Sequence, residues 1–499
     1  MKRHCVIAGL FALSCVFFAG PSSAQDWGAP WGAQIKLTYV EKSSRKLEQL
    51  TANCDWVEWD ATITSSNPTC NPTVSQTATR ADVLGQGLGY SFEHEGKLIF
   101  LFGDTFGATV GHGDGVAYFP TWTNVQNPFQ YLAGDTIAWS PTRRPEDKLL
   151  LNYFLSSDQT HGLIVQPEYT TSHCYPDGTC GTALPMGADD IPSSGISLDG
   201  QIYIVASTGT LFTSSGPDYS KNYSVLSKFD EYAGTFSAGR TISNLPTGGH
   251  FVYTSLREFP LDAGGWQTGF EEPFVVIFGV GQYNASNIYL SIVPKSGFES
   301  GAGTRYFTGL DKFGFPTWGT NDDSSNVPIV TDVDPANPTI GNLSVVYSRD
   351  LGLWLMTFNG GHGDSTTAGV YFSYSRTPWG PWSKPQLILN DCRDGALGNY
   401  IFYYYDPARP ATNTCPSAVV APSNTSGPSG PTIGPQGSTG NPPGTTRGGG
   451  FAPQMIERFT EIEGHTLKIY YTLSTWNPYT VIKMESDFTI TFSQPEDPD

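Results

Sequence analysis

The sequence predicts an all-β fold, a five-bladed β-propeller with long loop insertions. The 499 residues include 56 glycines and 37 prolines, and 13% are aromatic, which is typical of a turn-rich β protein with aromatic-lined clefts. Short apolar strands come in hairpin pairs, and such pairs recur five times along the chain. No segment with a helical period competes with them. A pair of β-sandwiches is the alternative fold.

The predicted propeller spans residues 81–490, and each hairpin in it is able to continue into a four-stranded sheet. The second hairpin turns at Asp199-Gly200, which is the strongest short hairpin signal. The predicted strand pairs are 88–92 with 97–102, 195–198 with 201–206, 273–280 with 287–293, 342–348 with 353–358, and 455–462 with 467–473.

The chain begins with an export signal. Lys2 and Arg3 precede the apolar stretch 6–18, and small residues at 22–24 form a cleavage site, so residues 1–24 are predicted to be a signal peptide. We therefore expect a secreted protein, extracellular or periplasmic, and a monomer. Residues 25–80 follow as a polar N-terminal leader. The Pro/Gly/Ser-rich tract 422–450 is predicted to be a flexible insertion in the propeller, because it cannot bury a core.

The net charge limits the classes of partner that we expect, and the cysteine content bears on the disulfides. Without Lys2 and Arg3, 25 basic residues (27 − 2) face 46 acidic ones, a net charge of −21 (25 − 46), which argues against nucleic acid or anionic membranes as partners. Six cysteines remain after signal cleavage, and an oxidising compartment favours disulfides between neighbours in sequence. The predicted pairs are Cys54 with Cys70, Cys174 with Cys180, and Cys392 with Cys415.

One strand stands out because it ends in a carboxylate. The stretch GKLIFLFGDTF (96–106) is apolar from Leu98 to Phe102 and then changes abruptly to Gly103 and Asp104. A rigid buried strand followed by glycine and aspartate is a way to deliver one charged group to a cleft. Asp104 is therefore the first candidate for chemistry, and a turn aspartate that bonds its own backbone is the plain alternative.

Six segments of the chain carry a resemblance to known proteins. In chain order they are GKLIFLFGDTF (96–106), DTIAWS (135–140), DIPSSGISLDGQIYIV (190–205), LSVVYSRDLGLWLMTF (343–358), YSRTPWGPWS (374–383) and LKIYYTLSTWNPYTVIKM (467–484). In this order they resemble the secreted five-bladed propeller family, long filed as a domain of unknown function, that includes endo-D-arabinanases. The resemblance implies hydrolysis of furanoside linkages, and it covers residues 81–488. In the family pattern a second carboxylate lies in a TDLG-like turn, where this chain has Gly87.

Glycosidases typically use two carboxyl groups, one to protonate the leaving oxygen and one as base or nucleophile. Asp104 is predicted to be the base or nucleophile. Asp135 also matches the family, and it could hold a sugar hydroxyl or act on a partner carboxyl through like-charge proximity. Glu271, in FEEP (270–273), resembles the general-acid position of other arabinan- and fructan-cleaving propellers. A turn residue is the alternative for Asp135, and a solvated surface residue for Glu271.

Substrate-binding candidates lie in loops and at strand ends. Asp190 precedes a strand, and Trp476 with Asn477 belongs to STWNPY, where a ring can stack on a sugar and an amide can bond a hydroxyl. Two Gly-His-Gly-Asp tetrads hold His112 and His362, which could bind a sugar or a metal. A histidine and an aspartate are too few ligands to specify Ca²⁺, so we expect no required cofactor, while a structural Ca²⁺ stays open.

These observations predict a glycoside hydrolase acting on a cell-wall polysaccharide, endo-acting on D-arabinan. Two alternatives stay open: a non-catalytic carbohydrate-binding or adhesion propeller, which Gly87 favours, and a furanosidase on L-arabinan. The chain has no Gly-x-Ser-x-Gly elbow and no phosphate-binding glycine loop, so nucleophilic serine and nucleotide chemistry are not expected.

Overall fold

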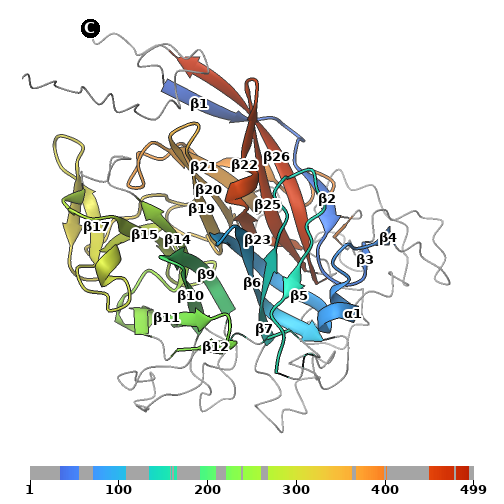
Figure 1. Cartoon of the computed structure of the whole chain (residues 1–499). Coiled ribbons are helices and arrows are strands. Elements are labelled where there is room, and N and C mark those ends of the chain that lie inside the picture. Colours follow the sequence, from blue (N-terminus) through green and yellow to red (C-terminus); the bar gives the residue numbers. More distant parts are fainter. Residues whose placement is uncertain are drawn as a thin grey trace, which may run out of the picture.

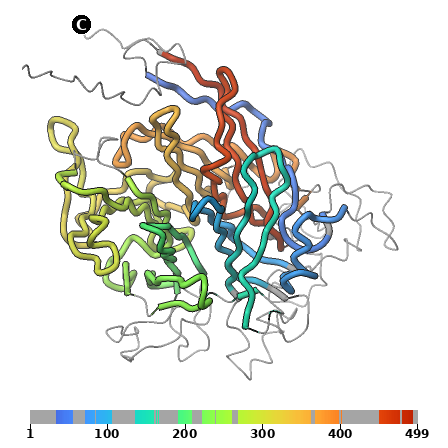
Figure 2. Tube along the Cα trace, in the orientation of Figure 1, coloured from blue at the N-terminus to red at the C-terminus, as the bar shows by residue number. Residues whose placement is uncertain are grey.

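A computed structural model describes residues 34–55, 71–107, 134–157, 191–208, 221–237, 240–259, 268–361, 367–397, 400–401, 449–476 and 479–493, and single positions between 159 and 165. Apart from one two-stranded ribbon, the strands form five antiparallel sheets around one axis, which confirms the predicted five-bladed β-propeller (Figures 1 and 2). The innermost strands contact one another in a closed ring, in the order β5 (Val83–His94), β9 (Ile191–Leu198), β14 (Tyr253–Phe259), β19 (Leu343–Ser348) and β23 (Gly449–Met455).

Each blade continues outward from its innermost strand through antiparallel neighbours. Blade 1 adds β6 (Lys97–Gly107), β7 (Gly134–Ser140) and β8 (Asn152–Tyr153). Blade 2 adds β10 (Gln201–Thr208), β11 (Tyr223–Asp230), β12 (Thr235–Phe236) and β13 (Arg240–Asn244). Blade 3 adds β15 (Phe274–Val280), β16 (Tyr289–Pro294), β17 (Arg305–Leu310) and β18 (Pro316–Gly319). Blade 4 adds β20 (Leu353–Gly360), β21 (Gly369–Ser375) and β22 (Gln386–Leu389), and blade 5 adds β24 (Glu461–Glu463), β25 (Thr466–Trp476) and β26 (Thr480–Ser493).

Blade 5 is completed by the start of the chain. The strands β1 (Gln34–Tyr39) and β2 (Arg45–Gln49) pair with β26, so both ends of the described chain share one sheet (Figure 1). The sequence placed this segment in a polar leader, although QIKLTY alternates and buries Leu37. The remaining elements are the ribbon β3 (Cys54–Asp55) with β4 (Asn71–Pro72), the helix α1 (Thr77–Ala81) and the 3-10 turns η2 (Leu245–Thr247), η5 (Lys295–Gly297) and η7 (Glu457–Phe459).

The middle of strand β6, residues 98–102, is apolar at every position because blades cover both of its faces. Phe100 and Phe102 pack in a core cluster that includes Val481 of blade 5. Ile99 and Leu101 point the other way, into a cluster with residues of β10 in blade 2. Successive side chains of a strand face opposite sides, so a strand between two blades needs apolar residues at every position. In the described part of the chain, no helix is long and apolar enough to cross a membrane.

The innermost strand of blade 3 is absent from the predicted strand pairs. Its sequence, YTSLREF, carries several polar residues, yet most of the strand is buried. Arg257 donates a hydrogen bond of 2.7 Å to the Tyr90 hydroxyl, and Ser255 accepts the Val345 N–H at 3.0 Å. These bonds link β14 to the inner strands of blades 1 and 4. The hydrogen-bond partners that allow these polar side chains to be buried come from other blades. The sequence of the strand itself therefore does not reveal them.

Candidate active site

The propeller has two ends that differ in which strand termini they hold. The inner strands begin at one end, where Leu88, Ile191, Tyr253 and Leu343 gather in one core cluster. Because neighbouring strands are antiparallel, each second strand ends there; Gly87 on β5, for example, pairs with Gly103 on β6. We call this the Asp104 end. The hairpins between first and second strands lie at the opposite end.

Asp104 is set on a bulged, left-handed point of β6. The pairing of β6 with β7 shifts register between Phe102 and Thr105, and Asp104 has φ +47°. This conformation costs a residue with a side chain about 1–2 kcal/mol, although aspartate tolerates it better than most. The bulge takes Asp104 out of the regular ladder, and the residue is half-buried. The strand therefore presents the Asp104 carboxylate at this end of the propeller.

Asp135 supports the backbone of Asp104 from the neighbouring strand. It is the second residue of β7, and its side chain has no exposed surface. Its Oδ1 accepts the Asp104 N–H at 3.0 Å, and its main-chain oxygen accepts the Val165 N–H at 2.8 Å. A buried carboxylate that accepts a backbone N–H holds that backbone in one geometry. The structure thus brings the two predicted candidates, Asp104 and Asp135, into contact. Asp104 is half-buried, and Asp135 is fully buried.

Tyr479 from blade 5 completes the immediate surroundings of Asp104. It precedes β26, and its hydroxyl lies 3.4 Å from Oδ2 of Asp104. The same hydroxyl would lie only 2.6 Å from a Cβ placed on Gly87, so it occupies the space in which a side chain at position 87 would begin. Sequence reasoning selected Trp476 and Asn477 but missed Tyr479, although the motif STWNPY ends on that residue.

We expect Gly87→Ala to be destabilising only while the Tyr479 hydroxyl is present. In the parent chain the new methyl group would overlap this oxygen, and overpacking of this kind typically costs about 1–3 kcal/mol. In Tyr479→Phe the next ring atom, Cζ, lies at 3.4 Å, which is ordinary contact. A double-mutant cycle by denaturant unfolding should therefore give a coupling free energy of about 1 kcal/mol or more. Strict additivity of the two changes would contradict the packing.

Side chains of the other three blades also gather at this end. Burial raises the pKa of Tyr283 to about 12, and the negative charge of Asp104 acts in the same direction, while Lys221 and a hydrogen bond with Asn359 act against it. Tyr283 follows β15, Lys221 precedes β11, and Asn359 lies in β20. Asn359 is thus a hydrogen-bond partner of Tyr283, and Lys221 lies close enough to act on it electrostatically. Together with Asp104 and Tyr479, every blade contributes one polar side chain.

A chain of neutral hydrogen bonds flanks the two aspartates within blade 1. The hydroxyls of Thr105 and Thr136 lie 3.0 Å apart, and Thr136 donates to Oε1 of Gln86 at 3.2 Å. The Gln86 amide in turn donates to the Tyr153 hydroxyl at 2.6 Å, and burial raises the pKa of Tyr153 far above its ordinary value. These groups carry no charge at neutral pH, so among the described residues of this chain of bonds Asp104 and Asp135 are the acidic neighbours.

Glu271 lies at the opposite end of the propeller. It is exposed and stands just before β15, the second strand of blade 3, where that strand pairs with the end of β14. Its neighbour Glu272 accepts hydrogen bonds from the backbone and hydroxyl of Ser296. Second strands begin at one end of the blade and finish at the other, so Glu271 cannot share a substrate with Asp104. The structure does not bring these two candidates together.

The other site candidates fall outside the described residues. Asp190, His112, His362 and Asn477 are not described, nor is the side chain of Trp476, and their roles stay predictions. Cys392 is disulfide-bonded, while the pairing of Cys54, Cys70, Cys174, Cys180 and Cys415 stays a prediction.

Comparison with known proteins places the chain in a family and finds similar solved structures. A sequence profile described as "Domain of unknown function (DUF4185)" matches residues 73–485. A thermostable family-43 glycoside hydrolase has 12% identity and a TM-score of 0.34, with 85% of this chain and 97% of that chain covered. An alpha-L-arabinofuranosidase from Podospora anserina has 11% identity and a TM-score of 0.34, with 91% of this chain and 99% of that chain covered.

A third similar structure is the subtype N11 neuraminidase-like protein of an influenza A virus from a flat-faced bat. It shows 10% identity and a TM-score of 0.32, with 92% of this chain and 99% of that chain covered. No curated protein matches the chain. With TM-scores below 0.5, these likenesses carry no conclusion about a reaction.

Proposed function

We propose that this chain, which belongs to the DUF4185 family, is a glycoside hydrolase that cleaves furanoside linkages, with D-arabinan as its substrate. The observation that carries the proposal is the placement of Asp104. It is a half-buried carboxylate on a left-handed backbone, at the end of the propeller where polar side chains from all five blades gather. The resemblance of GKLIFLFGDTF and STWNPY to endo-D-arabinanases supports the substrate class.

In the proposed reaction Asp104 acts as base or nucleophile at the anomeric carbon. Glycoside cleavage passes through an oxocarbenium-like transition state, which a nearby carboxylate stabilises. Asp135 holds the backbone of Asp104, and the Tyr479 hydroxyl donates to its Oδ2. Tyr283, whose hydroxyl stays protonated at ordinary pH, is placed to donate a hydrogen bond to a sugar hydroxyl.

The second carboxyl group is proposed to be Asp190. Glu271 lies at the opposite end, and Asp135 has no exposed surface with which to reach a substrate. Asp190 directly precedes Ile191, whose Cγ2 would lie 2.9 Å from a Cβ on Gly103, next to Asp104. Asp190 itself lies outside the described residues, so this assignment rests on its position in the chain.

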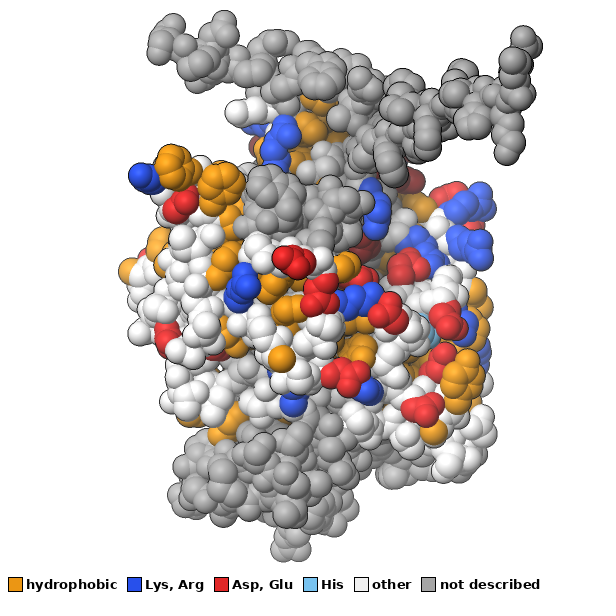
Figure 3. Space-filling model, turned by 60° about the vertical axis from the view of Figure 1, so that its left-hand side comes forward, with side chains coloured by type: hydrophobic (Ala, Val, Ile, Leu, Met, Phe, Trp, Pro, Cys, Tyr) orange, Lys and Arg blue, Asp and Glu red, His pale blue; other side chains and the backbone are white. Residues whose placement is uncertain are grey.

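The proposed setting is outside the cytoplasm, where a polysaccharide is accessible, and without a required cofactor. An uncharged polysaccharide is indifferent to the acidic balance of the chain. The face shown in Figure 3 carries acidic, basic and hydrophobic side chains among the described residues.

A substrate panel tests the function. We expect the mature protein to release oligosaccharides from D-arabinan, detected by mass, and to leave a pyranoside glucan intact. Release of oligosaccharides from L-arabinan alone would show that D-arabinan is the wrong substrate, while glycoside hydrolysis would still be the reaction. Binding to arabinan without any product after long incubation would overturn the enzyme and favour a carbohydrate-binding propeller.

A further inference from the structure

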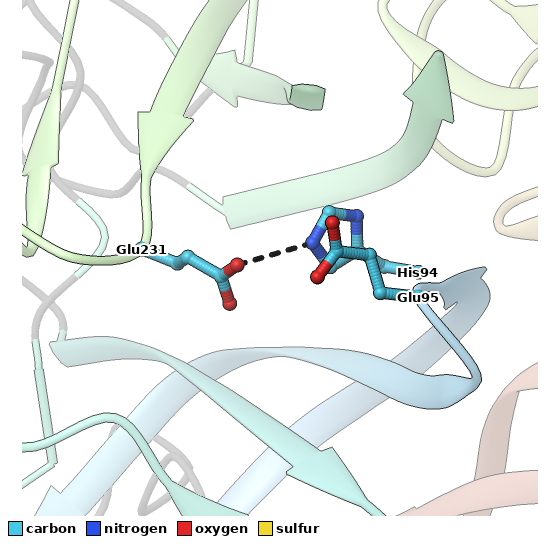
Figure 4. A group of neighbouring side chains, drawn as sticks. All are labelled: His94, Glu95 and Glu231. Atoms are coloured by element: carbon cyan, nitrogen blue, oxygen red, sulfur yellow. Dashed lines mark hydrogen bonds and ion pairs between the residues drawn. The ribbon is translucent and has the colours of Figure 1, made fainter. Parts of the chain in front are cut away.

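A group of metal-ligating side chains lies at the opposite end of the propeller, far from Asp104. His94 ends β5, Glu95 follows in the β5–β6 turn, and Glu231 follows β11 of blade 2 (Figure 4). One ligand atom from each residue lies within 4.8 Å of the other two. The group therefore joins blade 1 to blade 2 at the end that the proposed reaction does not use.

The histidine is held in the orientation that a metal ligand requires. His94 is only 2% exposed, its Nδ1 lies 2.9 Å from the Ser197 hydroxyl, and its Nε2 lies 3.3 Å from a carboxylate oxygen of Glu231. When Nδ1 donates to Ser197, Nε2 presents its lone pair toward the two glutamates. Metal-binding histidines are characteristically fixed in this way by a partner on the second nitrogen.

Two other joints between blades at this end are ion pairs that include a basic side chain. Arg458 of blade 5 pairs with Glu93 of blade 1, and Lys295 of blade 3 pairs with Asp199 of blade 2 at 2.7 Å. Among the described residues no lysine or arginine pairs with Glu95 or Glu231. Two carboxylates and one imidazole converge here, and a divalent metal ion binds this set of donors.

We propose that His94, Glu95 and Glu231 bind one zinc ion, which clamps blades 1 and 2 together. Imidazole nitrogen and carboxylate oxygen both bind Zn²⁺, at about 2.0–2.2 Å, and a water molecule would complete a four-coordinate site. The mixed donor set favours zinc over Ca²⁺ or Mg²⁺, which prefer oxygen ligands alone. Glu95 is exposed on a turn and Glu231 is half-buried, so both carboxylates have room to adjust to the ion.

Zinc titration of chelator-treated mature protein, against a chromophoric competitor, tests the site. We expect one Zn²⁺ per chain and, at a hundredfold excess over the Kd, a rise in Tm of roughly 3 °C, which Ca²⁺ does not reproduce. His94→Gln should abolish both effects. Ser197→Ala should weaken binding about 10–100-fold, because it releases the imidazole. Hydrolysis of arabinan should not depend on zinc, so failure here is distinguishable from failure of the proposed reaction.

The matched control is His465→Gln. His465 also stands in a hairpin turn near a glutamate, Glu463, but it is exposed and belongs to no group of three metal-ligating side chains among the described residues. We expect this variant to keep the full zinc stoichiometry. Where His94→Gln does not fold, Glu231→Gln at the surface gives the same test. Absence of zinc binding, or binding unchanged in both variants, would overturn the proposal and leave the His94–Glu231 contact as a plain polar pair.

Discussion

Asp104→Asn is expected to lower kcat/KM on D-arabinan by about 10²–10⁴-fold, the range typical of losing a positioned catalytic base. The amide has nearly the same shape but neither attacks nor accepts a proton. Asparagine also tolerates the left-handed φ of +47° as well as aspartate does, so the fold should be kept. Product mass analysis and a thermal melt on the same preparation measure both quantities. An unchanged Tm together with full activity would refute the role of Asp104.

Two further variants locate the partner of Asp104. Asp190→Asn is expected to cause a comparable loss, because both carboxyl groups act on one bond. Glu271→Gln is the matched control, since Glu271 is an exposed carboxylate at the opposite end of the propeller. Loss of activity in Glu271→Gln with retention in Asp190→Asn would contradict the arrangement proposed here.

Asp135→Ala is expected to reduce both activity and stability. The alanine leaves the Asp104 N–H without its acceptor inside the protein, and an unsatisfied buried donor costs about 1–3 kcal/mol. The bulge that presents Asp104 would lose its support, so we expect kcat to fall more than KM rises. Denaturant unfolding and steady-state kinetics measure the two effects.

Asp135→Asn separates positioning from charge. The amide oxygen still accepts the Asp104 N–H, so this variant should recover most of the kcat lost in Asp135→Ala. If Asp135→Asn were as inactive as Asp104→Asn, the Asp135 charge itself would take part in the reaction, and the positioning role would be wrong.

The blade architecture could be predicted because its signals are local. A strand packed between two blades needs apolar residues at consecutive positions, as 98–102 show, and a two-residue turn needs left-handed residues, as Asp199 (φ +50°) and Gly200 (φ +79°) show. The inner strand β14 was missed because its polar residues find partners only on other blades. The closing strands β1 and β2 were missed because they pair with β26, more than 400 residues away in the chain.

The propeller class and the candidate Asp104 both follow from the sequence, because a buried strand that ends in Gly-Asp can be recognised in one short segment. The groups that surround Asp104 become known only from the folded chain. Asp135 is buried and supports the backbone of Asp104, and Glu271 lies at the opposite end of the propeller. Tyr479 took the space beside Gly87. The physical reason is that ring closure brings together side chains from five blades, and the distances across that ring depend on strand direction and packing, which no local pattern encodes.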